Sequence, residues 1–115
     1  MPKISNQPKP EWASLPRAGC LNVEFRVLLN RDGLTVANLR FAQNANIDEH
    51  DAPMDIDAIC VSGSGFVSVA GEVSELSAGQ TVHWPANEMH KLWTTDTTME
   101  TIMVERVYQV GTQDG

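Results

Sequence analysis

The residues best suited to chemistry in this chain are two of its three histidines, His50 and His90. His50 follows Asp48 in an acidic stretch, and His90 closes a stretch that begins at Gly79. An imidazole titrates near neutral pH, and a neighbouring carboxylate raises its pKa and orients the ring. If one site holds both rings, His50 and His90 are predicted to be catalytic, as general acid and base.

The spacing that leads up to His90 matches a known motif. Gly79 is followed after five residues by Pro85, then by Asn87 and, three residues later, by His90. This resembles the second motif of the cupin superfamily, G-x5-P-x-G-x2-H-x3-N. Asn87 replaces the second glycine, and Thr94 replaces the final asparagine. Asparagine tolerates left-handed backbone angles, so we expect the turn to survive. The resemblance implies a histidine that points into a small β-barrel.

The other cupin motif, G-x5-H-x-H-x3–4-E-x6-G, is matched only in part. Ala42 stands for its first glycine, Asp48 for its first histidine, and His50 matches its second histidine. In the family, these two histidines, the glutamate and the later histidine together hold a metal ion.

The place of that glutamate is uncertain by one residue. Counting onward from His50 reaches Asp55, whereas counting back from Gly63 reaches Ile56. A one-residue β-bulge would reconcile the two counts. Whether Asp55 or Asp57 faces the barrel interior stays open at this point.

The resemblance leaves two hypotheses for the site. In the first, Asp48, His50, Asp55 and His90 hold a divalent Fe, Mn, Ni or Zn ion, which suits imidazole and carboxylate ligands. In the second, the metal site has been lost, and the histidines serve as hydrogen-bonding groups in a pocket for an organic ligand. The implied function is an oxygenase- or isomerase-type enzyme, or a ligand-binding or sensing protein without catalysis.

Aromatic and sulfur-containing side chains supply candidates for an apolar pocket wall. Phe41, Trp84, Trp93 and Met103 are predicted to line the substrate pocket, because such pockets are mostly apolar with a few polar groups. His83 lies one residue before Trp84 in a predicted strand, so it is expected to point to the surface.

The pattern of the whole chain predicts an all-β fold. Short apolar runs rich in β-branched residues are separated by turn residues, and no helical periodicity is sustained. The resemblance implies a jelly-roll barrel, or double-stranded β-helix, which closes off most strand edges. The predicted strands are 21–30, 34–41, 55–62, 66–70, 72–76, 80–84, 91–94 and 99–108, with a polar loop at 42–53 and a bend at 63–65.

A chain of 115 residues is long enough for one domain. We expect an irregular, proline-interrupted N-terminal arm over residues 1–20, a barrel domain over 21–110 and a frayed end at 111–115. The family commonly pairs through sheet edges or exchanged arms, so the resemblance implies a homodimer.

Composition excludes some partners. A net charge of −7 argues against nucleic acid and anionic membranes, because phosphate binding needs a basic patch. No apolar run approaches a membrane span, and the N-terminus lacks the apolar segment of a signal peptide. We therefore expect a cytoplasmic protein with no membrane partner, in which Cys60 is a small buried thiol.

Overall fold

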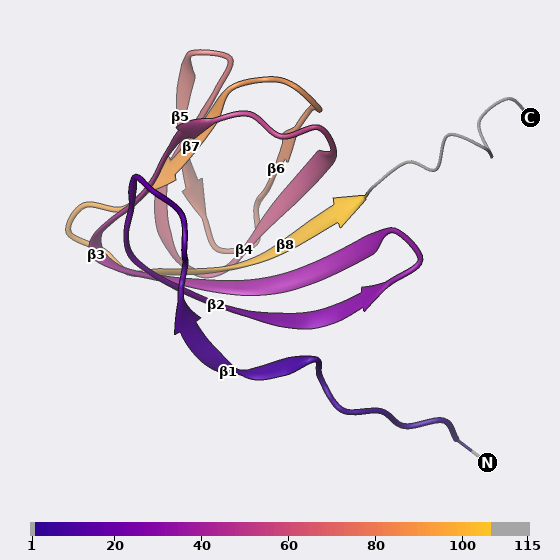
Figure 1. Cartoon of the computed structure of the whole chain (residues 1–115). Helices are drawn as coiled ribbons and strands as arrows, with labels where there is room; N and C mark the ends of the chain where they lie inside the picture. The colour runs from indigo at the N-terminus through magenta and orange to yellow at the C-terminus, as the bar shows by residue number, and fades with distance from the viewer. Residues whose placement is uncertain (1, 107–115) are drawn as a thin grey trace, which may run out of the picture.

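The computed structural model describes residues 2–106, and within them the chain forms eight strands and no helix (Figure 1). The all-β prediction is therefore confirmed. The strands are β1 Lys9–Ser14, β2 Cys20–Arg31, β3 Leu34–His50, β4 Asp55–Val69, β5 Glu72–Ser77, β6 Thr81–Trp84, β7 His90–Trp93 and β8 Met99–Arg106. The predicted end of the last strand at 107–108 and the predicted frayed segment 111–115 lie outside the described residues. No helix in residues 2–106 has the length and apolar character needed to span a membrane.

Two long strands, β3 and β4, close the sheet into a barrel. Each of them pairs with β8 along one part of its length and with β7 along another, so that β3, β8, β4 and β7 form a ring. Strands β5 and β6 both pair with β4, whereas β2 and then β1 extend the sheet beyond β3. In Figure 1 the layer made by β1, β2, β3 and β8 lies below the layer made by β5, β6 and β7.

Strand β3 continues through most of the segment that was predicted as a polar loop. That prediction was wrong because Ala45 and Ile47 keep the apolar alternation on the inner face, although their neighbours are polar. Asn44 has a φ of 55° and lets the strand turn toward β7. A register shift follows between Ile47 and His50. The shift reverses the alternation, so that His50 lies on the inner face.

The predicted bend at 63–65 does not interrupt β4. The strand runs through it, with a register shift between Cys60 and Ser62 and a φ of 74° at Gly63. A Cβ at Gly63 would collide with the carbonyl oxygen of Thr98. The glycine therefore lets the strand curve from β8 toward β7 without leaving the ladder.

The N-terminal arm is more regular than the sequence predicts, because it contains β1. This strand pairs with β2 in the register Lys9↔Val27 and Ala13↔Phe25. Pro10 is compatible with it because β1 lies at an edge of the sheet. The ring of Trp12 lies 4.5 Å and 4.1 Å from the guanidinium carbons of Arg26 and Arg40, which fastens the arm to the outside of the barrel.

The interior is filled by alternate residues of the closed ring. Cys60 is buried here, as predicted. At one level of the interior, Met103 is flanked by Ala37 on β3 and by Ala58 on β4. The small side chain of Ala37 borders open space inside the barrel, whereas Ala58 is fully buried in the core.

Candidate ligand cavity and histidine pair

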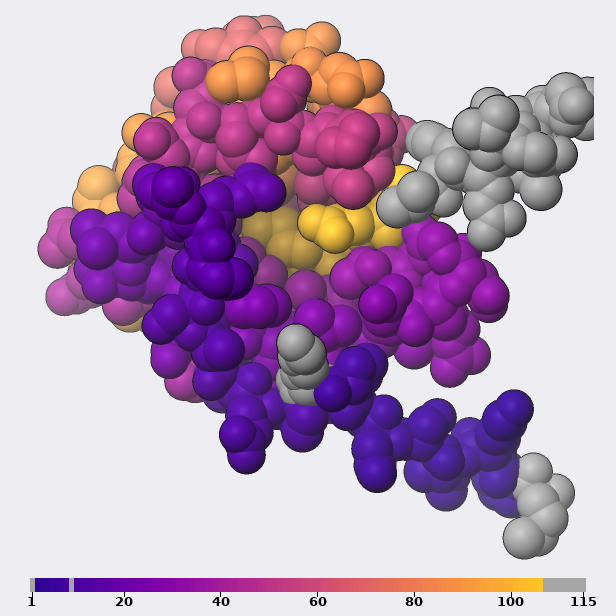
Figure 2. Space-filling view, in the orientation of Figure 1, coloured from indigo at the N-terminus to yellow at the C-terminus, as the bar shows by residue number. Residues whose placement is uncertain are grey.

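A cavity of about 390 Å³ opens at one end of the barrel. Figure 2 shows residues of β8 (yellow) inside a hollow, with the residues that precede β2 (indigo) beside its rim. Most of the wall is apolar, and the aromatic part of it comes from Phe25 and Trp84. The polar side chains that line it are Arg17, Thr35, His50, Asp51, His90 and Glu105.

The two predicted histidines meet in the wall of this cavity. The Nε2 atoms of His50 and His90 are 3.2 Å apart, and the rings meet edge to face with centroids 4.4 Å apart. His50 Nδ1 lies 2.8 Å from the carbonyl oxygen of Asp48, and His90 Nδ1 lies 3.2 Å from that of Glu88. A carbonyl oxygen only accepts, so both Nδ1 atoms carry the proton. In the neutral rings, both Nε2 atoms are therefore unprotonated, so two nitrogens that each carry a lone pair lie 3.2 Å apart.

The surroundings of His90 favour its uncharged form. The side chain is 1% exposed, and the indole of Trp84 stacks on its ring with centroids 4.1 Å apart and an angle of 5°. Burial and, to a smaller extent, the nearby His50 lower the pKa of His90 to about 4, against the opposing effect of the Glu88 carbonyl. At neutral pH His90 is a base with a free lone pair.

Local hydrogen bonds fix the segment that presents His90. Asn87 has a φ of 67°, the left-handed conformation expected from the motif, and its N–H donates to the carbonyl of Ala52 at 2.7 Å. The hydroxyl of Thr94 donates to the carbonyl of Ala42 at 2.6 Å and accepts from the N–H of Ala45 at 3.0 Å. Thr94 thereby joins the end of β7 to β3.

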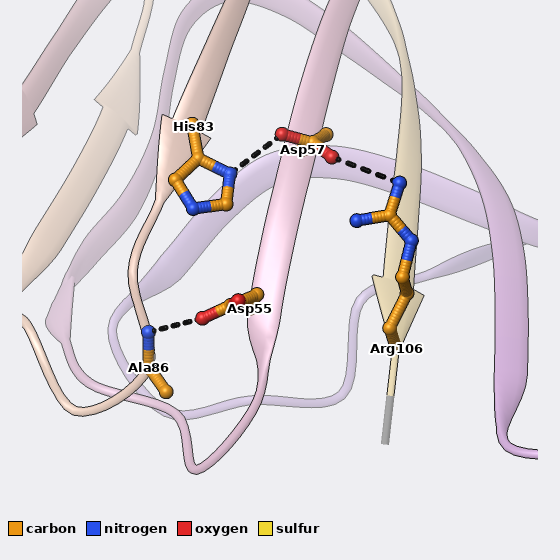
Figure 3. Close-up of polar contacts among 5 residues, drawn as sticks. All are labelled: Asp55, Asp57, His83, Ala86 and Arg106. Carbon is orange, nitrogen blue, oxygen red and sulfur yellow. Dashed lines mark hydrogen bonds and ion pairs between the residues drawn. The ribbon is translucent and has the colours of Figure 1, made fainter. Parts of the chain in front are cut away.

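The predicted carboxylate ligands are not brought to the histidine pair. Asp48 is exposed and packs beside Gly19. Asp55 accepts a hydrogen bond from the N–H of Ala86 at 2.8 Å (Figure 3). It thus supports the turn between β6 and β7.

Neither aspartate of the ambiguous pair faces the interior, because Ile56 does. Ile56 is buried and lines the cavity, which agrees with the count back from Gly63. Asp57 lies on the outside of β4 (Figure 3), 2.7 Å from His83 Nδ1 and 3.4 Å from the guanidinium of Arg106. His83 is exposed, as predicted.

The residues present do not make the four-ligand metal site that the motif implies. An apolar Ile56 occupies the glutamate position, and Asp48 points away from the imidazoles. Among residues 2–106, no three His, Cys, Asp or Glu side chains lie close enough to hold an ion. The histidine pair offers two imidazole ligands, which is half of the four ligands that a tetrahedral zinc ion takes.

Two of the four predicted pocket residues line the cavity, namely Trp84 and Met103. Phe41 is instead buried in the core outside this cavity. Trp93 stacks on Phe66 with centroids 5.8 Å apart, on the opposite side of β7 from His90. The alternation along a strand decides this outcome, because odd and even residues of β7 face opposite sides.

Sequence reasoning missed Glu105 and Arg17. Glu105 continues the inward alternation of Met99, Thr101 and Met103 along β8, so the signal was present as a period of two. Burial raises the pKa of Glu105, and the positive charge of Arg17 opposes that rise. Arg17 lines the mouth from the arm, a place that no local pattern indicates.

Comparison with solved structures decides the fold. The polyketide cyclase RemF from Streptomyces resistomycificus superposes with a TM-score of 0.82 at 16% identity, over 96% of this chain and 82% of its own. A cupin-2 domain protein from Rhodospirillum rubrum superposes with a TM-score of 0.78 at 14% identity, over 95% of this chain and 78% of its own. This chain has the cupin fold. A predicted oxalate decarboxylase from Thermotoga maritima shares this cupin fold, with a TM-score of 0.77 at 20% identity, over 87% of this chain and 93% of its own. No protein-family model and no curated protein matches the sequence.

Proposed function

We propose that this cupin protein binds a small, mostly apolar organic molecule in the barrel cavity and moves a proton on it with His50 and His90. The observation that carries the proposal is the meeting of the two Nε2 atoms, 3.2 Å apart, in the wall of a cavity of about 390 Å³. Their Nδ1 protons are held by backbone carbonyls, so both lone pairs remain available to a bound molecule.

The pair is suited to accept one proton. Two unprotonated nitrogens this close repel each other, and a proton bound to one of them replaces that repulsion with a charge-assisted hydrogen bond to the other. A ligand with an acidic C–H beside a carbonyl group would give this proton to one Nε2 and become an enolate. Return of the proton to another atom of the same enolate isomerises the ligand without oxidation or reduction. The presence of a polyketide cyclase among the similar structures supports chemistry of this kind.

A two-ring ketone tests both parts of the proposal. The probe is 2-tetralone in D₂O, with exchange of its acidic C–H groups followed by NMR and its binding measured by equilibrium dialysis. The protein is expected to bind the ketone and to accelerate exchange. His50→Gln and His90→Gln should remove the acceleration, whereas His83→Gln, on the outer surface, should retain it.

The outcomes separate two functions. Binding without any acceleration of exchange would reject catalysis of this kind and favour a ligand-binding or sensing protein. If 2-tetralone does not bind, the cavity proposal itself fails for ligands of this class.

A competing proposal places a divalent Fe, Mn, Ni or Zn ion on the same two imidazoles, with the ligand or water completing its shell. The spacing favours it, because two nitrogens at about 2.0–2.1 Å from zinc at a tetrahedral angle lie about 3.3 Å apart. Metal analysis of the purified protein separates the proposals. Stoichiometric metal that is lost in His90→Ala would support the ion, and metal-free protein that takes up none of the four ions would reject it.

We also propose a homodimer that uses the outer face of the closed ring. Val36 and Val104 are register neighbours there, as are Ile59 and Ile102, and all four are only half-buried. An apolar patch of this kind suits a second copy of the chain. Light scattering should give a dimer for the wild type and a monomer for Val104→Asp. Val73→Asp, at an exposed position of β5, should remain a dimer.

A further inference from the structure

Glu105 is a carboxylate in the mostly apolar wall of the cavity. It lies on β8 directly opposite Thr35 of β3 and Ile56 of β4, and all three line the cavity. Ile56 occupies the position where the motif has a glutamate. An acidic side chain is therefore present on the neighbouring strand, next to the place where the expected one is missing.

The carboxyl group of Glu105 has no hydrogen-bond or ion-pair partner within residues 2–106. It is half-buried, and burial raises its pKa. A half-buried carboxylate loses part of its hydration, and the charge of Arg17 opposes this effect without supplying a hydrogen bond. A hydrogen-bond donor on a bound molecule would supply the missing partner.

The register also sets how far Glu105 lies from the aromatic stack that holds His90. Glu105 lies opposite Ile56, and Ile56 lies opposite Trp84, whose ring stacks on His90. The backbones of Glu105 and Trp84 are thus two strand spacings, about 10 Å, apart. A molecule of about two fused rings spans this distance and can contact both Glu105 and the stack that holds His90.

The charge near Glu105 at the cavity mouth bears on the kind of hydrogen-bond donor that a ligand would carry. Arg17 lines the same opening and acts electrostatically on Glu105. Arg17 thus already supplies a positive charge near this carboxylate, and a neutral hydroxyl on the ligand can add the hydrogen bond that the geometry lacks.

We infer that the cavity is selective for neutral two-ring compounds with a hydroxyl group at the end remote from the histidines, and that Glu105 accepts the hydrogen bond from that hydroxyl. This inference rests on the proposed ligand cavity and deepens it by naming the substrate class. Glu105 determines specificity, and the proton transfer remains with the histidine pair.

The test compares 6-hydroxy-2-tetralone with 6-methoxy-2-tetralone, which lacks only the donor, by equilibrium dialysis. The wild type should bind the hydroxy compound about tenfold or more tightly than the methoxy compound, as expected for a hydrogen bond to a charged group. Glu105→Leu should lose this preference and bind the methoxy compound at least as well. Glu105→Gln, which keeps the shape and a neutral acceptor, should show an intermediate preference. Glu75→Leu, exposed on β5, should match the wild type.

Three results would overturn the inference and leave the cavity intact. They are equal binding of the two compounds by the wild type, an unchanged preference in both Glu105 variants, and tightest binding of 6-carboxy-2-tetralone, which would assign recognition to Arg17. Failure of every tetralone to bind would instead reject the ligand cavity on which the inference depends. Circular dichroism of each variant confirms that the barrel has folded.

Discussion

Ala37 and Ala58 offer a matched pair of substitutions that tests whether the space inside the barrel is a binding cavity. Both alanines flank Met103, one on each neighbouring strand. Ala37 is half-buried and lines the cavity, whereas Ala58 is 0% exposed and lies outside its lining. The same change to leucine should therefore have opposite effects on stability at the two positions.

The magnitudes follow from the volume available. In Ala37→Leu, three added carbon groups enter free space, and at about 0.8 kcal/mol each their burial contributes at most about 2.4 kcal/mol to the free energy of unfolding. We expect a gain of about 1 kcal/mol after the loss of side-chain freedom. In Ala58→Leu, the same groups overpack a filled site, and a loss of about 1–3 kcal/mol is expected.

In Ala37→Leu, the affinity for 2-tetralone should change in the opposite direction to the stability. Ala37→Leu narrows the cavity, so its affinity for 2-tetralone should fall about tenfold or more while the protein becomes more stable. Urea unfolding followed by tryptophan fluorescence gives the stabilities, and equilibrium dialysis gives the affinities. If both leucine variants lose stability equally and Ala37→Leu binds the ketone as the wild type does, the space beside Met103 is not a ligand cavity.

The remaining predictions concern the buried base and the strand curvature. Because the pKa of His90 is about 4 in the folded protein and about 6.5 when unfolded, the unfolded chain binds more protons between these values. The contribution of His90 to the free energy of unfolding should thus be constant above about pH 6.5 and fall by at most about 3 kcal/mol toward pH 4. Urea unfolding across this range should show a weaker pH dependence of stability in His90→Gln than in the wild type. Equal pH dependence in the two proteins would contradict the lowered pKa of His90. Gly63→Ala should destabilise by more than about 2 kcal/mol because its Cβ meets a backbone carbonyl, whereas Gly71→Ala, also at positive φ but with open space around it, should cost about 1 kcal/mol. Similar thermal unfolding of the two glycine variants would show that the collision at Gly63 is relieved at little cost.

The sequence was sufficient to predict the all-β fold and to single out His50 and His90, for a physical reason. Strand alternation and turn residues are local signals, and the spacing from Gly79 to His90 encodes a turn whose left-handed residue, Asn87, is observed. His50 was harder to place, because its inward orientation depends on a register shift after Ile47 that no local pattern reveals. The two histidines are adjacent because β3 and β7 pair, which is a property of the closed ring.

The acidic residues show where local patterns stop being informative. Asp48, Asp55 and Asp57 stand at or beside motif positions, yet each faces away from the imidazoles, and Ile56 faces inward instead. A slip of one residue in a strand exchanges inside for outside, so a motif count that is uncertain by one cannot choose between neighbours. Glu105 could have been found by extending the alternation of β8, but it belongs to no motif.

The most direct test of the histidine pair is the protonation of its rings in metal-free protein at pH 7.5, observed in long-range ¹H–¹⁵N NMR spectra. We predict that His50 and His90 both carry the proton on Nδ1, with Nε2 unprotonated on each ring. A proton found on Nε2 of either neutral ring would contradict this prediction, because the cavity wall would then hold only one nitrogen able to accept a proton.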